Sequence, residues 1–444
     1  MKRFIRIVRA LGFAIAIALL VAAPARAFCG FYVSQANAEL YNQASQVIIA
    51  RDGDRTILTM ANDYQGDVQD FALVVPVPVL LKEDQVRVGD PKIIQRLDSF
   101  SAPRLVEYFD ANPCDPVVIR EVSPSNLRAA PSDVSNDAEG QLGDRYGVTV
   151  EERFSLGEYD ILILSAKESN GLEDWLRAND YNIPEGASRL LQPYIRQNLK
   201  FFVAKVNLEE YAESEFQSLR PLLMAFESPR FMLPIRLGTV NAKGPQDLLV
   251  YLLSPTGQVE LANYRTVNVP SDVEIPEFVQ GKFGDFYTSM FDLAYQRENR
   301  RVAFREYAWN MANCDPCSAP QLTPDELRAA GVFWAEPGTV PNLFITRLHV
   351  RYTFDDFPED LRFQTTPNQQ FFQGRYVIRH PFRGNISCAA GREYRRQLRA
   401  RQLREMQTLA QLTGWNLPEL RQQPEFIDTP TESDSPPWWR RVWN

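Results

Sequence analysis

The stretch that decides the fold runs from Tyr159 to Leu237 and opens on an apolar run, Tyr159-Asp-Ile-Leu-Ile-Leu164. A second such run, Phe201-Phe-Val-Ala-Lys-Val206, follows after segments around Trp175 and Leu190 in which apolar residues recur at helical spacing. Two short apolar runs, 221–226 and 231–237, complete the stretch. Strands with helices between them predict an α+β fold, and the stretch contains no recognisable catalytic motif.

Strand patterns also surround this stretch. Ser45-Gln-Val-Ile-Ile-Ala50 and Arg55-Thr-Ile-Leu-Thr-Met60 flank an Asp-Gly turn, which predicts a β-hairpin. Phe71–Val75 is a continuous apolar run, typical of a strand buried on both faces. Phe344–Phe354 alternates as in a half-buried strand, and Tyr376–His380 predicts another strand. We therefore expect a core of antiparallel, β-rich sheet with inserted helices.

Helices are expected in several other places. Segments 90–97 and 103–109 each carry a proline near the first turn, which is typical of a short helix. Residues 283–295 show helical spacing, and 306–313 are expected to end a helix. Residues 391–412 predict a long, basic, exposed helix, and the Pro/Ser/Asp-rich tail after it predicts disorder.

The N-terminus has the three parts of a secretory signal. Basic residues precede an apolar run, Leu11–Ala23, and Ala25-Arg26-Ala27 supplies small residues before a cut at Phe28. The alternative is an uncleaved anchor. We expect export to the periplasm or cell envelope of a bacterium, and a division into residues 1–27 (signal peptide), 28–158 (β-rich part), 159–390 (α+β part) and 391–444 (basic helix and tryptophan-containing tail).

The charge of the chain disfavours nucleic-acid partners. The 48 lysines and arginines fall to 43 once the five in residues 1–27 are removed, against 56 acidic residues. An acidic surface cannot neutralise phosphates in the way that general nucleic-acid binding requires.

Five cysteines follow the expected cut, and all five are candidates for disulfides in an oxidising compartment: Cys29, Cys114, Cys314, Cys317 and Cys388. Cys314-Asp-Pro-Cys317 has the spacing of thiol–disulfide oxidoreductases, whose CxxC follows a buried strand and opens a helix. Because 306–313 predicts a helix end and 318–324 a loop, a structural disulfide is the favoured interpretation. A second pair of ligands for zinc is missing.

Other chemistries find little support. His349 and His380 are the only histidines, so a histidine-rich metal site such as HExxH is excluded, and neither a metal nor a cofactor is predicted. There is no Gly-x-Ser-x-Gly elbow and no glycine-rich nucleotide loop. His349 is expected to be a surface histidine on the polar face of its strand.

The C-terminal part could contact an envelope surface or a partner. The candidates are basic residues of the long helix and tryptophans of the tail: Arg395, Arg396, Arg399, Trp438, Trp439 and Trp443. Docking of the basic helix onto the acidic body is the alternative.

Four pieces of the chain resemble the bacterial DUF2330 family, an exported domain of unknown function. They are Phe28-Cys-Gly30; Gln46–Gly53 with Val74-Val-Pro-Val-Pro78; Tyr159–Leu237 with Asp174-Trp-Leu-Arg177 and Tyr181-Asn-Ile-Pro184; and Thr346-Arg-Leu-His349 with Glu359-Asp-Leu361. The resemblance implies export and carries no activity, so no catalytic residue is transferred. The sequence thus favours a non-catalytic binding or scaffold protein; the alternatives are a thiol–disulfide oxidoreductase through Cys314 and Cys317 and an unspecified hydrolase.

Overall fold

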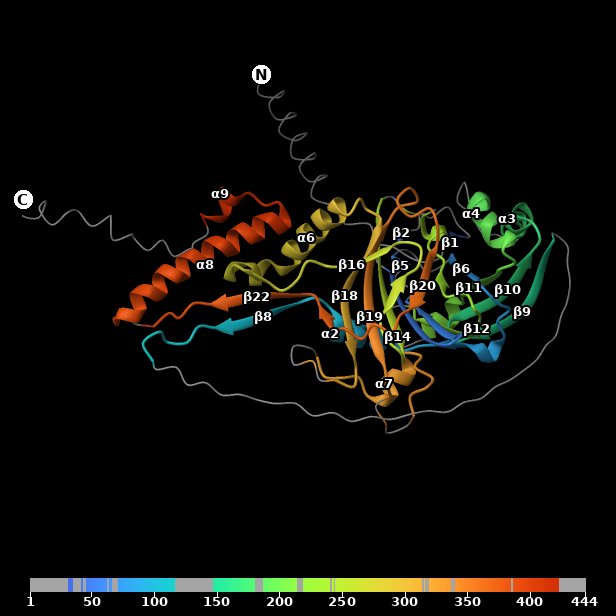
Figure 1. Ribbon diagram of the computed structural model, residues 1–444. Coiled ribbons are helices and arrows are strands. Elements are labelled where there is room, and N and C mark those ends of the chain that lie inside the picture. Colours follow the sequence, from blue (N-terminus) through green and yellow to red (C-terminus); the bar gives the residue numbers. More distant parts are fainter. Residues whose placement is uncertain are drawn as a thin grey trace, which may run out of the picture.

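Two stacked β-sheets and a projecting arm make up the protein (Figure 1). The computed structural model describes residues 31–34, 41–42, 45–61, 64–65, 71–115, 147–179, 187–213, 219–239, 242, 244–313, 315, 319–336, 339, 341–384 and 386–422. The predicted α+β class is confirmed, and most strand pairs are antiparallel.

The first sheet has five strands in the order β1-β6-β11-β10-β9. These strands are β1 (Phe31–Ser34), β6 (Phe71–Val77), β11 (Lys200–Val206), β10 (Tyr159–Ala166) and β9 (Val148–Leu156). Helices α3 (Ser169–Ala178) and α4 (Ala187–Arg196) are inserted between β10 and β11, as predicted. Trp175 and Tyr194 pack on this sheet and belong to its core.

The second sheet has nine strands, eight of them in the order β16-β18-β19-β14-β3-β4-β12-β7, with β21 beside β18. Their bounds are β16 (Arg265–Asn268), β18 (Val302–Asn310), β19 (Phe344–Tyr352), β14 (Gln246–Ser254), β3 (Ser45–Asp52), β4 (Arg55–Met60), β12 (Leu222–Glu227), β7 (Val86–Val88) and β21 (Phe372–Gln373). The predicted hairpin is confirmed as β3–β4, which turns at Gly53 with a φ of 56°. Glycine adopts this left-handed conformation at little cost.

The main core lies between the two sheets. It joins Ile49 of β3 and Val250 of β14 to Val75 of β6 and Ile161 of β10. Neighbouring residues point the other way, because side chains alternate along a strand. Val74 packs with α3 and α4 on one outer side, and Ile48 packs with α2 (Pro91–Ser101) and α7 (Pro324–Ala329) on the other.

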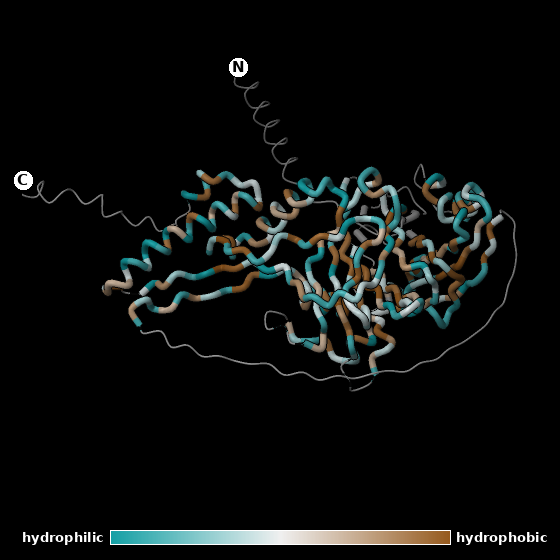
Figure 2. The backbone as a smooth tube through the Cα atoms, viewed as in Figure 1, coloured by the Kyte–Doolittle hydropathy of each residue, from teal (hydrophilic) through white to brown (hydrophobic). Residues whose placement is uncertain are grey.

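The arm consists of β8 (Arg104–Phe109), β22 (Arg375–His380), β17 (Val273–Ile275) and the long helix α8 (Ala389–Thr413). β22 pairs in parallel with β17 on one side and with β8 on the other. Helix α6 (Phe283–Arg297) packs where the arm meets the body, and Phe286 and Met290 share a core with Tyr376 and Leu409. α8 is largely hydrophilic along its length (Figure 2), as its sequence predicted.

Small elements complete the fold. They are β2 (Tyr41–Asn42), β5 (Tyr64–Gln65), β13 (Met232–Leu233), β15 (Val259–Leu261), β20 (Leu361–Thr365), α5 (Leu208–Glu213), α9 (Leu417–Leu420) and the 3-10 turns Glu83–Gln85, Arg236–Thr239 and Glu277–Lys282.

Two predicted helical segments are strands in the structure. Residues 103–109 contain β8, whose six residues pair with β22 more than 270 positions along the chain. Residues 306–313 contain the second half of β18, in which the buried residues Tyr307 and Ala308 pair with β19 on one side and with β21 on the other. In both cases distant strand pairing overrode a local helical pattern, since local propensity differs by less than about 1 kcal/mol per residue.

Candidate functional site

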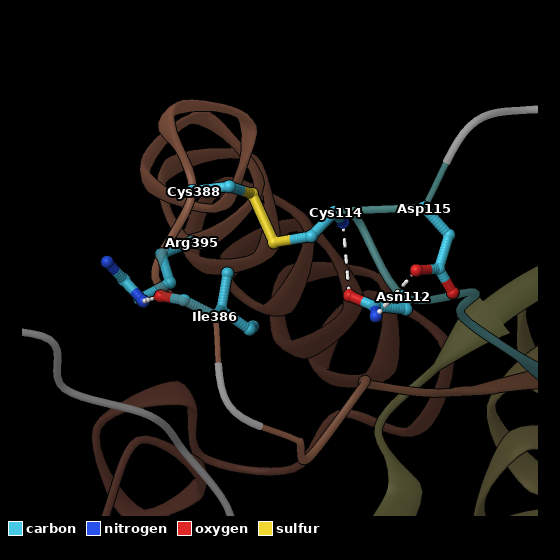
Figure 3. Close-up of a disulfide and its surroundings, with 6 residues drawn as sticks. All are labelled: Asn112, Cys114, Asp115, Ile386, Cys388 and Arg395. Carbon is cyan, nitrogen blue, oxygen red and sulfur yellow. Dashed lines mark hydrogen bonds between the residues drawn. A yellow bond between two sulfur atoms is a disulfide. The ribbon is translucent and has the colours of Figure 1, made fainter.

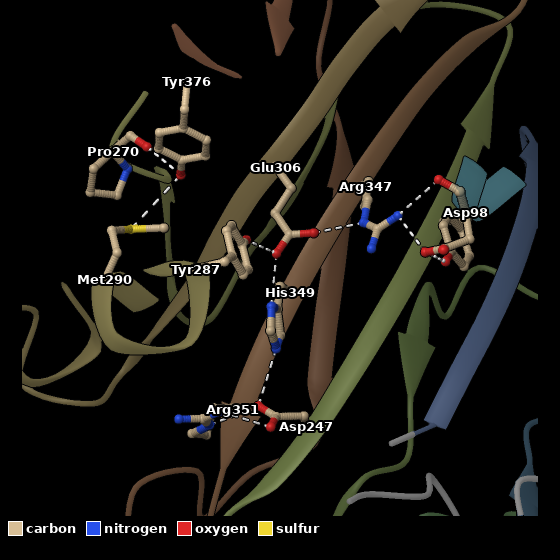
Figure 4. Close-up of polar contacts among 11 residues, drawn as sticks. Asp98, Asp247, Pro270, Tyr287, Met290, Glu306, Arg347, His349, Arg351 and Tyr376 are labelled. Carbon is tan, nitrogen blue, oxygen red and sulfur yellow. Dashed lines mark hydrogen bonds and ion pairs between the residues drawn. The ribbon is translucent and has the colours of Figure 1, made fainter. Parts of the chain in front are cut away.

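A cluster of charged side chains, centred on His349, lies on one face of the nine-stranded sheet, and its members Glu306 and Arg347 are buried (Figure 4). His349 Nδ1 lies 2.8 Å from Glu306 Oε1, and His349 Nε2 lies 3.1 Å from Asp247 Oδ1. The three residues come from the adjacent strands β19, β18 and β14. Phe291 of α6 stacks on the imidazole with 4.0 Å between ring centres. Both ring nitrogens of His349 are therefore occupied, and one ring face is covered.

The local backbone explains how Glu306 reaches its partners. The register of β18 against β19 shifts between Arg305 and Tyr307, so Glu306 is the extra residue of a β-bulge. In a bulge the extra residue is left out of the strand pairing, and its side chain points in a direction that a regular strand would not allow. Glu306 thereby contacts both Arg347 and His349, which are two residues apart on β19.

Arginines extend the cluster in two directions. Arg347 bonds to Glu306 Oε2 through Nε at 2.6 Å and to Asp98 Oδ1 through Nη1 at 2.7 Å. At the other end, Arg351 donates two hydrogen bonds to Asp247, at 2.7 and 2.8 Å, and pairs with Asp292. The terminal carboxylates are partly exposed, whereas Glu306 and Arg347 are buried. We name these seven residues, Asp98, Asp247, Asp292, Glu306, Arg347, His349 and Arg351, the sheet cluster.

The electrostatics of the sheet cluster favour the charged forms of His349, Glu306 and Asp247. Burial alone would lower the pKa of His349, but the carboxylates of Glu306 and Asp247 outweigh it and raise the pKa to about 9. Burial opposes ionisation of Glu306, yet Arg347 and His349 lower its pKa to about 2. Hydrogen bonds from His349 and Arg351 likewise outweigh burial and hold the pKa of Asp247 well below its usual range.

His380 has the same arrangement at the end of the arm. Its Nδ1 lies 2.9 Å from Glu277 Oε1 and its Nε2 lies 2.6 Å from Glu107 Oε2. Phe109 stacks on the ring with 4.4 Å between centres. Burial opposes the charged form, but the two carboxylates prevail and raise the pKa of His380.

This arrangement leaves little room for histidine catalysis. A general base in a catalytic triad needs one ring nitrogen facing the nucleophile and the other facing an orienting group. In both histidines the two nitrogens bond to carboxylates from different elements. The expectation of a surface histidine at position 349 is wrong, because α6 covers the polar face of β19.

Among the described residues, a disulfide joins two of the five candidate cysteines (Figure 3). Cys114 follows β8, and Cys388 is the N-cap residue of α8; their Cα atoms lie 5.9 Å apart. Cys29, Cys314 and Cys317 lie outside the described residues. The disulfide fixes the start of α8 to the segment that follows β8, across 274 positions of sequence.

The structure does revise the surroundings of the CxxC sequence. The residues before Cys314 were predicted to end a helix, and this prediction was the argument against a redox site. They instead belong to a largely buried strand, β18, which runs up to Asn310. Asp315 is buried and bonds to the Tyr307 hydroxyl and to Gln373 Nε2, at 3.0 and 2.7 Å. No helix begins among the described residues that follow until Pro324.

The basic residues predicted to make contacts lie at the start of α8, and they differ in their surroundings. Arg395 is partly buried and donates to the Ile386 carbonyl, while Arg396 is exposed and pairs with Glu393. Arg399 is partly exposed. Trp438, Trp439 and Trp443 lie outside the described residues.

Sequence reasoning missed Glu306, Asp247, Glu107 and Glu277 as partners of the histidines. No local signal marks them, because each comes from an element 40 or more positions away from its histidine. Among the described residues, no group of three or more histidine, cysteine or acidic side chains is arranged to hold a metal ion. None of the helices in the described part of the chain is long and apolar enough to cross a membrane.

The sequence comparisons place the chain in a family. A family model described as an uncharacterized protein conserved in bacteria, DUF2330, matches residues 23–364, so the chain belongs to the DUF2330 family and the resemblance is confirmed. No curated protein and no solved structure matches the chain. The match ends before β22 and α8, so part of the arm lies beyond the family region.

Proposed function

We propose that this protein is an exported, non-catalytic binding or scaffold module of the bacterial periplasm or cell envelope. The observation that carries the proposal is the state of the two histidines, each of which bonds to carboxylates through both ring nitrogens. A hydrolase that used either histidine as its base would have to break one of these bonds before it could accept a proton.

Two observations support export. Residues 1–27 have the composition of a signal peptide. The Cys114–Cys388 disulfide is of a kind that persists in oxidising compartments and is rare in the cytosol.

Export can be tested by fractionating cells that produce the full chain and a variant lacking residues 2–27. We expect the full chain in the periplasmic fraction, with Phe28 as its N-terminal residue and the disulfide formed. The truncated variant should remain in the cytoplasm. A full chain that stays in the cytoplasm with residue 1 intact would refute the proposal of export.

The non-catalytic assignment can be tested with a panel of ester, peptide, glycoside and phosphate-ester substrates. We expect no turnover above that of a heat-unfolded sample. Turnover that is lost in His349→Gln or His380→Gln, in a variant that still folds, would overturn it.

Thiol–disulfide exchange through Cys314 and Cys317 is the second candidate, and the buried strand β18 ahead of this pair favours it. Under the first proposal, the purified protein should not catalyse the reduction of insulin by dithiothreitol. Catalysis that survives in Cys114→Ser/Cys388→Ser and disappears in Cys314→Ser would make the protein an oxidoreductase.

A further inference from the structure

The end of the arm exposes aromatic side chains. β8 ends with Tyr108 and Phe109, which are 44% and 74% exposed. Phe109 is the most exposed large apolar residue in the described part of the chain. Phe109 stacks on His380, and the Arg379 guanidinium lies over the Tyr108 ring. Side chains alternate along a strand, so the two rings lie on opposite faces of β8, and Phe109 is the large apolar group that this end of the arm presents most openly to solvent.

Exposed arginines gather at the same end. α8 begins at this end of the arm, beyond β8 and β22 and beside the segments that follow them (Figures 1 and 3). Arg392 and Arg396 are exposed one helical turn apart, and the Arg383 side chain is 70% exposed. Arg383 pairs with Glu277 and Arg396 pairs with Glu393, but both arginine side chains remain exposed. Arg401 is largely enclosed in the arm, where it pairs with Asp110 at 2.8 Å.

The acidic groups of this end are largely engaged by the arm itself. Asp110 accepts hydrogen bonds from Arg401 and from the Tyr394 hydroxyl. Glu107 and Glu277 bond to His380. α8 carries six arginines and two glutamates, whereas the whole chain has a net charge of −8. Positive charge is therefore concentrated on α8, in a chain that is acidic overall.

The end of the arm is also held in shape. The Cys114–Cys388 disulfide ties α8 to the segment after β8, and the Tyr394 hydroxyl both donates to Asp110 and accepts from the backbone N–H of Phe382. A surface that is ordered before it binds loses little conformational entropy on binding.

We propose that the end of the arm binds the surface of an anionic lipid bilayer. Arg383, Arg392 and Arg396 would meet lipid phosphates, and Phe109 would enter the interfacial layer, where aromatic rings are favoured. The inference deepens the proposed function, on which it rests for the presence of a membrane, by naming the partner of an exported module.

Sedimentation with vesicles tests this inference on the purified, disulfide-bonded chain of residues 28–444. We expect binding to vesicles of phosphatidylcholine with phosphatidylglycerol, a loss of binding at high salt, and no binding to phosphatidylcholine alone. Arg392→Glu/Arg396→Glu should weaken binding by about tenfold or more, because each basic residue at an anionic surface contributes about 1 kcal/mol. Phe109→Ser should weaken it by a smaller factor.

Matched controls lie on the body. Arg362 is 60% exposed and pairs with a glutamate three residues before it, as Arg396 does, and Phe371 is 46% exposed. Arg362→Glu and Phe371→Ser should bind vesicles as the unaltered protein does. Thermal unfolding of every variant separates lost binding from lost folding.

Equal binding to both vesicle types, no binding at all, or an equal loss in the control variants would overturn the inference. Binding to soluble polyglutamate that is as tight as binding to vesicles, and that is unchanged in Phe109→Ser, would also overturn the inference. Such a result would show a general attraction to polyanions. The vesicle assay uses purified protein, so a protein that is exported but does not bind would refute the lipid contact alone. A protein that binds but is not exported would refute the proposed location alone.

Discussion

The two histidines of this protein occupy two versions of one arrangement, one in the body and one on the arm. Each imidazole lies between two carboxylates and against a phenylalanine ring. In the body, Glu306 has 1% of its side chain exposed, and α6 covers the site. On the arm, Glu107 is 38% exposed and the stacking Phe109 faces solvent.

The comparison shows that the burial of an ion pair, more than its contacts, decides how much the pair contributes to the stability of the fold. A buried pair that loses one partner leaves a charge without compensation, whereas an exposed pair exchanges its partner for water. The body therefore depends on its sheet cluster, while the arm depends on its core around Tyr376 and on the disulfide.

The largest effect is expected from Glu306→Gln. It leaves Arg347 and His349 in a buried site with one carboxylate fewer, which should lower the free energy of unfolding by about 3–5 kcal/mol. Urea denaturation measures this value. The matched change Glu277→Gln on the arm should cost much less, and equal costs would contradict the comparison.

A pH dependence centred on His349 should come next. Folding raises its pKa from 6.5 to about 9, so the protonated ring stabilises the fold fully below pH 6.5, and this contribution is lost as the pH rises through 9. One pKa unit corresponds to about 1.4 kcal/mol, so the free energy of unfolding should fall by on the order of 3 kcal/mol over this pH range.

Two measurements check this. Unfolding free energies from pH 6 to 10 should fall for the unaltered protein and stay flatter for His349→Gln. An NMR titration should show two imidazoles, since the chain has only two histidines. Assigned through His380→Gln, the His349 signal should titrate near pH 9; a midpoint near 6.5 would refute the ionised cluster.

Removing the disulfide should have an intermediate and local effect. Cys114→Ser/Cys388→Ser should cost about 2 kcal/mol, at the low end for a native disulfide, because the bond restrains the arm alone. Hydrogen exchange should quicken in the first turns of α8 and remain slow in β14 and β19. If hydrogen exchange quickened equally in β14 and β19, the disulfide would stabilise the whole fold and not the arm alone.

The smallest effect is expected from Glu107→Gln. Its ion pair with His380 is partly exposed and should contribute less than about 1 kcal/mol. Urea denaturation at low and high salt measures it. A loss as large as that of Glu306→Gln would mean that the arm histidine is as deeply embedded as the one in the body.

Local patterns predicted the fold well wherever a segment's own residues fix its conformation. The Asp-Gly turn predicted the β3–β4 hairpin, and the apolar spacing around Trp175 and Leu190 predicted α3 and α4. Local patterns failed at β8 and at the end of β18, where charged and aromatic residues resemble a helix face. There, pairing with distant strands supplied backbone hydrogen bonds that no local pattern announces.

The candidate site was less predictable than the fold. His349 was correctly placed on the polar face of a strand, but its exposure was not, because α6 covers that face. The partner carboxylates were indistinguishable from the chain's many other acidic residues. The bulge that aims Glu306 arises only when β18 pairs with β19.

The sequence by itself determined the α+β class, the helices inserted after β10, the basic character of α8 and the family, because composition and periodicity are properties of short segments. Only the tertiary structure decided which cysteines pair, which carboxylates enclose each histidine and which arginines of α8 remain exposed. These depend on contacts between residues up to 291 positions apart, which burial and strand pairing bring together.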